Sequence, residues 1–229
     1  MGFFEPPPPP PPEPEPEVHD WDVPEWMGPP SNVLGAPVAL QVVLHRSDQL
    51  AIAVTGIVAF RTGFMFSVLT KATAVLEEME PHWMWRHRRL REGLPDDLFR
   101  FGVQYADGRK ATNLNSPFGG LDPDQVPDGG PVLSERSGGG GGGSWKQGYW
   151  LWPLPPPGEL SFVCEWPAHG IAETRIAIDA PPIIAAAEQA VVLWDAQSRG
   201  GSGGSGAYAY RALRSHQRGP APDAPPDGS

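Results

Sequence analysis

Cys164, the only cysteine of the chain, lies five residues before His169, and this pair is the first candidate for nucleophilic chemistry. An imidazole that takes the proton of a nearby thiol is a common way to activate a cysteine nucleophile. Cys164, however, alternates along the chain with Leu160, Phe162 and Trp166. A thiol on such an apolar face is desolvated, which raises its pKa and lowers its reactivity. We therefore expect a structural core cysteine and no catalytic dyad.

Metal ligation is the second candidate chemistry, because His82 and His87 are close in sequence and His45 could join them. Two imidazoles share one helical face when they are four residues apart, whereas these two are five apart. The glycine run 138–143 formally matches a dinucleotide-binding motif, but the residues after it predict a strand where that motif needs a helix. We expect no metal site, no cofactor and no catalytic residue.

A segment rich in arginine and tryptophan, residues 82–91, has the most unusual local composition. Arginine beside aromatic rings can grip phosphate or stack on bases, and it can also contact an acidic protein surface. We rank a solvated arginine face first, a protein contact second and nucleic acid third. The candidate interaction residues here are Trp83, Trp85, Arg86, Arg88, Arg89 and Arg91.

The expected strand 145–152 carries four aromatic residues, Trp145, Tyr149, Trp150 and Trp152, on both of its faces. One face must therefore present aromatic rings to solvent or to another element. Exposed rings on a β-sandwich can stack on sugars, which makes a ligand- or carbohydrate-binding domain the alternative function. Core packing or a contact between molecules is the first interpretation of Trp150 and Trp152.

The negative charge of the chain is concentrated near its beginning. The chain has a formal net charge of −10, and residues 1–31 hold seven acidic residues and no Lys or Arg. A nearly neutral remainder argues against nucleic acid as a partner. The first residues lack the pattern of a secretory signal, and no apolar run reaches the length of a membrane span. We expect a cytoplasmic protein without a membrane partner.

Alternation of apolar and polar residues predicts where the strands lie. Residues 37–70 predict a three-stranded meander, and residues 72–92 a helix or a long excursion. The period returns at 99–105 and 109–114, joined by a type I′ turn at Asp107-Gly108. Further strands are expected at 131–137, 145–153, 160–166 and 171–178, with the glycines 138–143 as a mobile hairpin tip.

A short helix is predicted at 183–194, with Asp179 as its N-cap and prolines in its first turn. Its apolar face would contain Ile183, Ala187, Val191 and Trp194. Either Trp21 or Trp26 is expected to anchor the N-terminal segment on the folded body.

These elements predict a mainly β fold, an antiparallel β-sandwich of about eight or nine strands, with one or two peripheral helices. The predicted organisation is a disordered Pro/Glu-rich tail at 1–31, the sandwich at 32–195, and a disordered Gly/Ser/Pro-rich tail at 196–229. The leading functional hypothesis is a non-enzymatic interaction or structural module. Its partner would be another protein or a second copy of the chain.

Three strings carry a resemblance. They are the residues 100–110, RFGVQYADGRK, the residues 150–158, WLWPLPPPG, and the residues 163–167, VCEWP. The chain resembles, over roughly residues 30–190, a group of proteins of no known function from high-GC actinobacteria. The resemblance implies a cytoplasmic actinobacterial origin and assigns no activity, ligand or catalytic residue.

Overall fold

The computed structural model describes residues 24–74, 93–115 and 130–194, which all belong to one compact unit, Val23–Asp195. The predicted tails and the segment 75–92 lie outside the described residues, apart from residues 24–31. The described strands are β1 (Val33–Leu34), β2 (Ala36–Pro37), β3 (Val42–Arg46), β4 (Leu50–Ala59), β5 (Phe64–Ala72), β6 (Arg100–Tyr105), β7 (Lys110–Thr112), β8 (Val132–Gly141), β9 (Ser144–Trp152), β10 (Glu159–Trp166), β11 (Ile171–Asp179) and β12 (Val191–Val192). The helices are the 3-10 turns η2 (Asn113–Asn115) and η4 (Pro167–His169) and the α-helix α2 (Pro181–Glu188).

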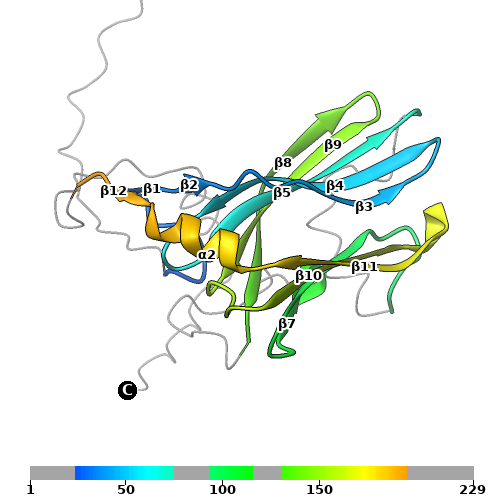
Figure 1. Cartoon of the computed structure of the whole chain (residues 1–229). Helices are drawn as coiled ribbons and strands as arrows, with labels where there is room; N and C mark the ends of the chain where they lie inside the picture. Colours follow the sequence, from blue (N-terminus) through cyan, green and yellow to red (C-terminus); the bar gives the residue numbers. More distant parts are fainter. Residues whose placement is uncertain (1–23, 75–92, 116–129, 195–229) are drawn as a thin grey trace, which may run out of the picture. The chain divides into compact units, whose positions relative to one another are not determined.

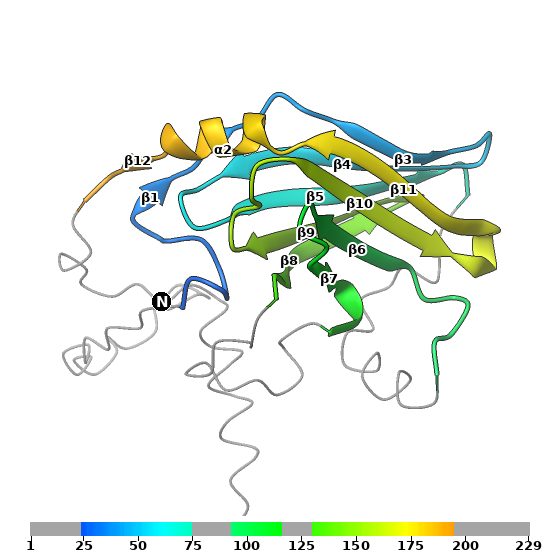
Figure 2. The ribbon, with the colours of Figure 1, turned by 60° about the horizontal axis from the view of Figure 1, so that its bottom comes forward.

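Two antiparallel sheets face each other, as the sequence predicts for a sandwich (Figure 1). The larger has the strand order β2-β4-β5-β9-β8, with β3 also paired to β4. The smaller has the order β11-β10-β6-β7, and β1 pairs separately with β12. The predicted meander over residues 37–70 is confirmed as β3, β4 and β5, because each is antiparallel to the next. Figure 2 shows the smaller sheet lying across one face of the larger.

Aromatic rings from both sheets fill the space between them. Phe66 of β5 packs against Phe162 of β10 with ring centroids 5.5 Å apart, and against Phe101 of β6 at 5.8 Å. Tyr149 of β9 stacks on Phe101 at 5.4 Å. Burial of such large rings is the main stabilising contribution in a core of this kind. The inward positions of each strand are the alternate ones, as period two requires.

The turn between β6 and β7 differs from the predicted type I′ turn. Gly108 has a φ of +87°, but no described residue other than glycine has a positive φ, so Asp107 does not. The Gly108 amide donates to the Tyr105 carbonyl, and the Asp107 side chain accepts from the amide of Arg109 at 3.0 Å. This is a three-residue loop with a left-handed glycine, and the Asp107 carboxylate holds the backbone in it.

The prediction that all six glycines 138–143 form a mobile tip is wrong. Four of them continue β8, where Gly138 and Gly139 lie opposite Gln147 and Lys146 of β9. Only Gly142 and Gly143 turn the chain, with φ values of +58° and +85°. Two successive positive φ angles match the right-handed twist of a two-residue hairpin, and glycine adopts them without steric cost.

Helix α2 is shorter than predicted, and its cap is different. Ala180 occupies the N-cap position and makes no side-chain cap bond, whereas Asp179 ends β11. The prolines follow in the first turn as expected. The helix ends at Glu188, and Val191 belongs to β12 rather than to the apolar face of the helix. Branched valines favour an extended backbone, and Val191 pairs with Leu34 of β1 in this conformation.

The larger sheet has an outer cover made by residues 24–28, which belong to the tail predicted at 1–31. Trp26 is only 2% exposed, which confirms the expected anchor; Trp21 lies outside the described residues. Ser134 and Arg136 of β8 donate to the carbonyl oxygens of Trp26 and Met27. This short stretch therefore packs as part of the sandwich. None of the described helices has the length and apolar character needed to cross a membrane.

Candidate functional site

The structure describes only two of the eight candidate interaction residues, Trp150 and Trp152. Trp83, Trp85, Arg86, Arg88, Arg89 and Arg91 lie outside the described residues. Trp150 has no exposed surface, and its ring meets that of Phe60 edge-on at 5.6 Å. Trp152 is partly buried opposite Val132 of β8.

Strand β9 does place aromatic residues on both faces, as expected, and both faces are covered near Trp150. Tyr149 and Leu151 point into the core, and Trp150 points to the outer face beneath residues 24–28. The indole nitrogen of Trp150 donates to the carbonyl of Glu25 at 2.9 Å. The element that covers the outer face at Trp150 is therefore a segment of the same chain. A ring buried in this way offers no face for stacking on a ligand.

Cys164 has the environment of a core residue. Its side chain is 1% exposed, and burial raises the pKa of its thiol to about 11. His169 lies in the η4 turn, where its ring packs on Trp166 with centroids 4.0 Å apart. A protonated, enclosed thiol is a poor nucleophile at neutral pH. The geometry supports the structural interpretation of this cysteine.

Two carboxylates of the smaller sheet and its β6–β7 turn form ion pairs. Arg100 of β6 donates to Glu165 of β10 at 2.6 Å, and Arg109 donates to Asp107 at 2.8 Å. The hydrogen bond from Arg109 lowers the pKa of the exposed Asp107 carboxyl. Within residues 24–74, 93–115 and 130–194, no three His, Cys, Asp or Glu side chains gather in a way that could hold a metal ion.

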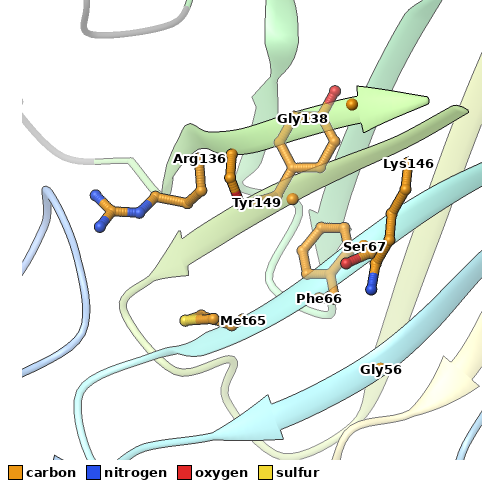
Figure 3. Close-up of a pocket in the computed structure, with 11 residues that line it drawn as sticks. Gly56, Met65, Phe66, Ser67, Arg136, Gly138, Lys146 and Tyr149 are labelled. Carbon is orange, nitrogen blue, oxygen red and sulfur yellow. The ribbon is translucent and has the colours of Figure 1, made fainter. Parts of the chain in front are cut away.

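A shallow depression lies on the larger sheet beside the cover, with a volume of about 450 Å³ (Figure 3). It exists because small residues adjoin one another across four strands. Ser67 of β5 lies opposite Thr55 of β4 on one side and Gly148 of β9 on the other. Its floor and rim include Gly56, Ser67, Ser137, Gly139, Lys146 and Gly148.

The depression carries positive charge. Arg136 and Lys146 belong to its lining, and no Asp or Glu does among the described residues. Figure 3 shows the two side chains extending in different directions, and the Arg136 guanidinium reaches the cover, where it donates to the Met27 carbonyl at 3.1 Å. Such spacing suits an extended ligand with separated acidic groups better than a single small anion.

The open edge of β8 adjoins this depression. β8 is the last strand of the larger sheet, and residues 136–141 are exposed. Residues of an antiparallel pair alternate between those whose backbone groups face the partner and those whose groups face away. A two-residue turn closes on an inward-facing pair, here Gly141 with Ser144. The N–H and C=O groups of Gly140 and Gly138 therefore point away from β9.

Sequence reasoning missed this site because its residues are small. Glycines 138–141 are interpreted as flexible when their pairing with β9 is unknown. The available signal was the equal spacing of the two arms around Gly142-Gly143, which places four glycines opposite Ser144–Gln147. Comparison of the chain with protein-family models, with curated proteins and with solved structures finds no match.

Proposed function

We propose that this protein is a non-enzymatic, cytoplasmic interaction module that binds an extended acidic segment of another protein along the glycine edge of β8. The observation that carries the proposal is the open backbone of Gly138 and Gly140 at the end of the larger sheet. An extended peptide can add to such an edge as one more strand, and its main chain then supplies most of the hydrogen bonds.

In the part of the chain that the structure describes, the edge also lacks the usual protection against an added strand. Natural edge strands are commonly blocked by proline, by a charged side chain or by a covering element. Gly138–Gly141 have no side chains, and they belong to the last strand in the order of the larger sheet. Among the described residues, no strand pairs with this part of β8 on the side away from β9.

Charge selects the class of partner. The cations Arg136 and Lys146 border the depression, and the side chains of an added strand would alternate over this face. Glutamate or aspartate at alternate positions of the peptide would lie near these cations. We therefore propose an acidic segment in extended conformation as the partner.

The Trp-rich strand supports the alternative, ligand or carbohydrate binding, less well. Trp150 and Tyr149 are buried, and the cover at residues 24–28 occupies the outer face near them. For this reason we place the interaction module first.

The test uses the full chain and two synthetic octapeptides, one alternating valine with glutamate and one alternating valine with lysine. Binding of the glutamate peptide should shift the amide NMR signals of Gly138 and Gly140, and the lysine peptide should have little effect. Lys146→Glu should weaken binding about tenfold, whereas Lys110→Glu on β7 of the other sheet should not. Equal binding of both peptides, or shifts confined to other strands, would refute the proposal.

Gly138→Pro provides a second test, since it removes one outward N–H, and the nearest obstacle to a side chain there is the flexible end of Gln147. Gly139→Ala is its matched control, because its methyl group meets open space. The proline variant should lose binding and the alanine variant should retain it. Unchanged binding by folded Gly138→Pro protein would argue against strand addition.

A further inference from the structure

A second surface, away from β8, is formed where β1 pairs with β12. Leu34 lies opposite Val191, and Val33 lies opposite Val192. The chain stays extended after β12, because the Leu193 amide donates to the Asn32 carbonyl at 2.8 Å and the Asn32 side chain donates to the Trp194 carbonyl at 2.9 Å. We call the five exposed apolar residues here the β12 ribbon: Leu34, Val191, Val192, Leu193 and Trp194.

The β12 ribbon exposes an unusual amount of apolar surface. Its five residues are between 44% and 60% exposed, and only Val43 and Leu94 are comparable large apolar residues elsewhere in the described chain. With side chains of ordinary size, this corresponds to roughly 500 Å² on one molecule, divided between the two faces of the ribbon.

The backbone of β12 is also open. The bond from Leu193 to Asn32 identifies that pair as inward-facing, so the next inward-facing pair is Val191 with Leu34. Between them, the N–H and C=O of Val192 point away from β1. The sheet made by β1 and β12 contains no other described strand. In both views β12 lies at the outside of the sandwich (Figures 1 and 2).

We infer that the β12 ribbon is the contact between two copies of this chain, with β12 paired antiparallel to β12 of the second copy around Val192. A two-fold axis at Val192 would let each valine donate to and accept from its counterpart. The result is a continuous four-stranded ribbon in the order β1, β12, β12, β1.

Composition and symmetry favour a second copy as the occupant. Pairing at Val192 places the apolar side chains on each face of the ribbon beside those of the second copy. An antiparallel edge is complementary to itself, and the five ribbon residues carry no charge that would repel an identical surface. Val191 and Leu193 would lie on one face of the joined ribbon, and Val192 and Trp194 on the other. The inference does not depend on the proposed function, because β8 belongs to another sheet.

The first test is the molar mass of the full chain by sedimentation over a concentration series reaching on the order of 100 μM. The wild type should pass from monomer to dimer. Val192→Glu places two carboxylates opposite each other and should weaken the dimer at least about tenfold. Val43→Glu is the matched control, because Val43 is 56% exposed but lies on β3, and it should leave the dimer unchanged.

Disulfide trapping locates the contact. The Cα atoms of a hydrogen-bonded antiparallel pair are about 5.5 Å apart, which is within the range of a disulfide. Val192→Cys should form a covalent dimer under mild oxidation, whereas Val43→Cys should not, and the enclosed Cys164 should not compete. A monomeric wild type, a dimer insensitive to Val192→Glu, or equal trapping at both positions would overturn the inference. Failure of peptide binding at β8 would leave these results unchanged.

Discussion

The indole nitrogen of Trp150 donates a hydrogen bond at 2.9 Å to the backbone carbonyl of Glu25, 125 residues earlier in the chain. This bond fixes the cover at residues 24–28 on the outer face of β9. Trp26, the other tryptophan of this contact, is equally enclosed but its indole nitrogen has no hydrogen-bond partner among the described residues. The two rings therefore stabilise the cover in different ways.

Replacement of each ring by phenylalanine should separate these contributions. Trp150→Phe leaves the Glu25 carbonyl without its donor, and Trp26→Phe removes no hydrogen bond. We expect Trp150→Phe to lower the free energy of unfolding by about 1–2 kcal/mol more than Trp26→Phe. Urea denaturation followed by circular dichroism measures the difference. A larger loss for Trp26→Phe would show that packing alone holds the cover.

The thiol of Cys164 should be unreactive in the native protein. Because its pKa is raised to about 11 and its side chain is enclosed, a thiol reagent at pH 8 should modify it only after denaturant is added. Rapid modification of the folded chain would contradict the core position.

The same shift predicts a pH dependence of stability. An unfolded thiol loses its proton near pH 9, whereas the folded one keeps it to about pH 11. The unfolded state therefore binds fewer protons in this interval, and stability falls as pH rises from 9 to 11. Cys164→Ala should reduce this slope by up to about 1.4 kcal/mol per pH unit. The free energies of unfolding of the wild type and Cys164→Ala, measured at pH 8, 9, 10 and 11, test this prediction. Parallel curves for the two proteins would show that other groups cause the loss of stability at alkaline pH.

Gly143 should tolerate no side chain. Its φ is +85°, and a methyl group there would lie 2.5 Å from the carbonyl oxygen of Ala72, which is backbone and cannot move aside. Gly143→Ala should cost about 2 kcal/mol or more. Gly141→Ala is the control, since its methyl group meets open space, and it should be neutral or slightly stabilising. Thermal unfolding distinguishes the two, and equal effects would mean that the turn is not held against β5.

Asn113 acts as a substitute for backbone at the edge of β6. Its side-chain oxygen accepts from the Phe101 amide at 2.9 Å, and its nitrogen donates to the Phe99 carbonyl at 3.0 Å. The residue is 2% exposed, so Asn113→Ala leaves both groups buried and unpaired, at a cost of about 2–4 kcal/mol.

Asn113→Asp is a matched variant that keeps the acceptor for Phe101 and loses only the donor to Phe99. Its loss should be smaller near pH 3, where the carboxyl can be protonated and donate, than at pH 7. Chemical denaturation at both pH values measures this. A loss for Asn113→Asp that does not change with pH would contradict the hydrogen-bonding role.

The strands could be predicted because their inward positions are apolar at every second residue. Leu160, Phe162, Cys164 and Trp166 show this period without interruption, and they form β10. The end of α2 could not be predicted, because Val191 fits the spacing of a helical face as well as it fits a strand. Its pairing with Leu34, 157 residues away, decides between the two.

The candidate sites could be predicted less well than the strands. Trp150 and Trp152 have the composition of a binding surface, but Trp150 is buried beneath residues 24–28, where its indole nitrogen donates to the Glu25 carbonyl. No periodicity encodes such a distant contact. The glycine edge of β8 could not be predicted for the opposite reason. Residues without side chains form no apolar period, and only their pairing with β9 shows where they lie.

The glycines of β8 also bear on self-assembly. Open sheet edges often template fibrils, because added chains stack and their side chains interlock in dry zippers. Gly138–Gly141 have no side chains to interlock, and ordering glycine costs more conformational entropy than ordering any other residue. An added strand must therefore supply the side-chain contacts from its own sequence. The glycine edge therefore gives no side-chain advantage to a growing stack.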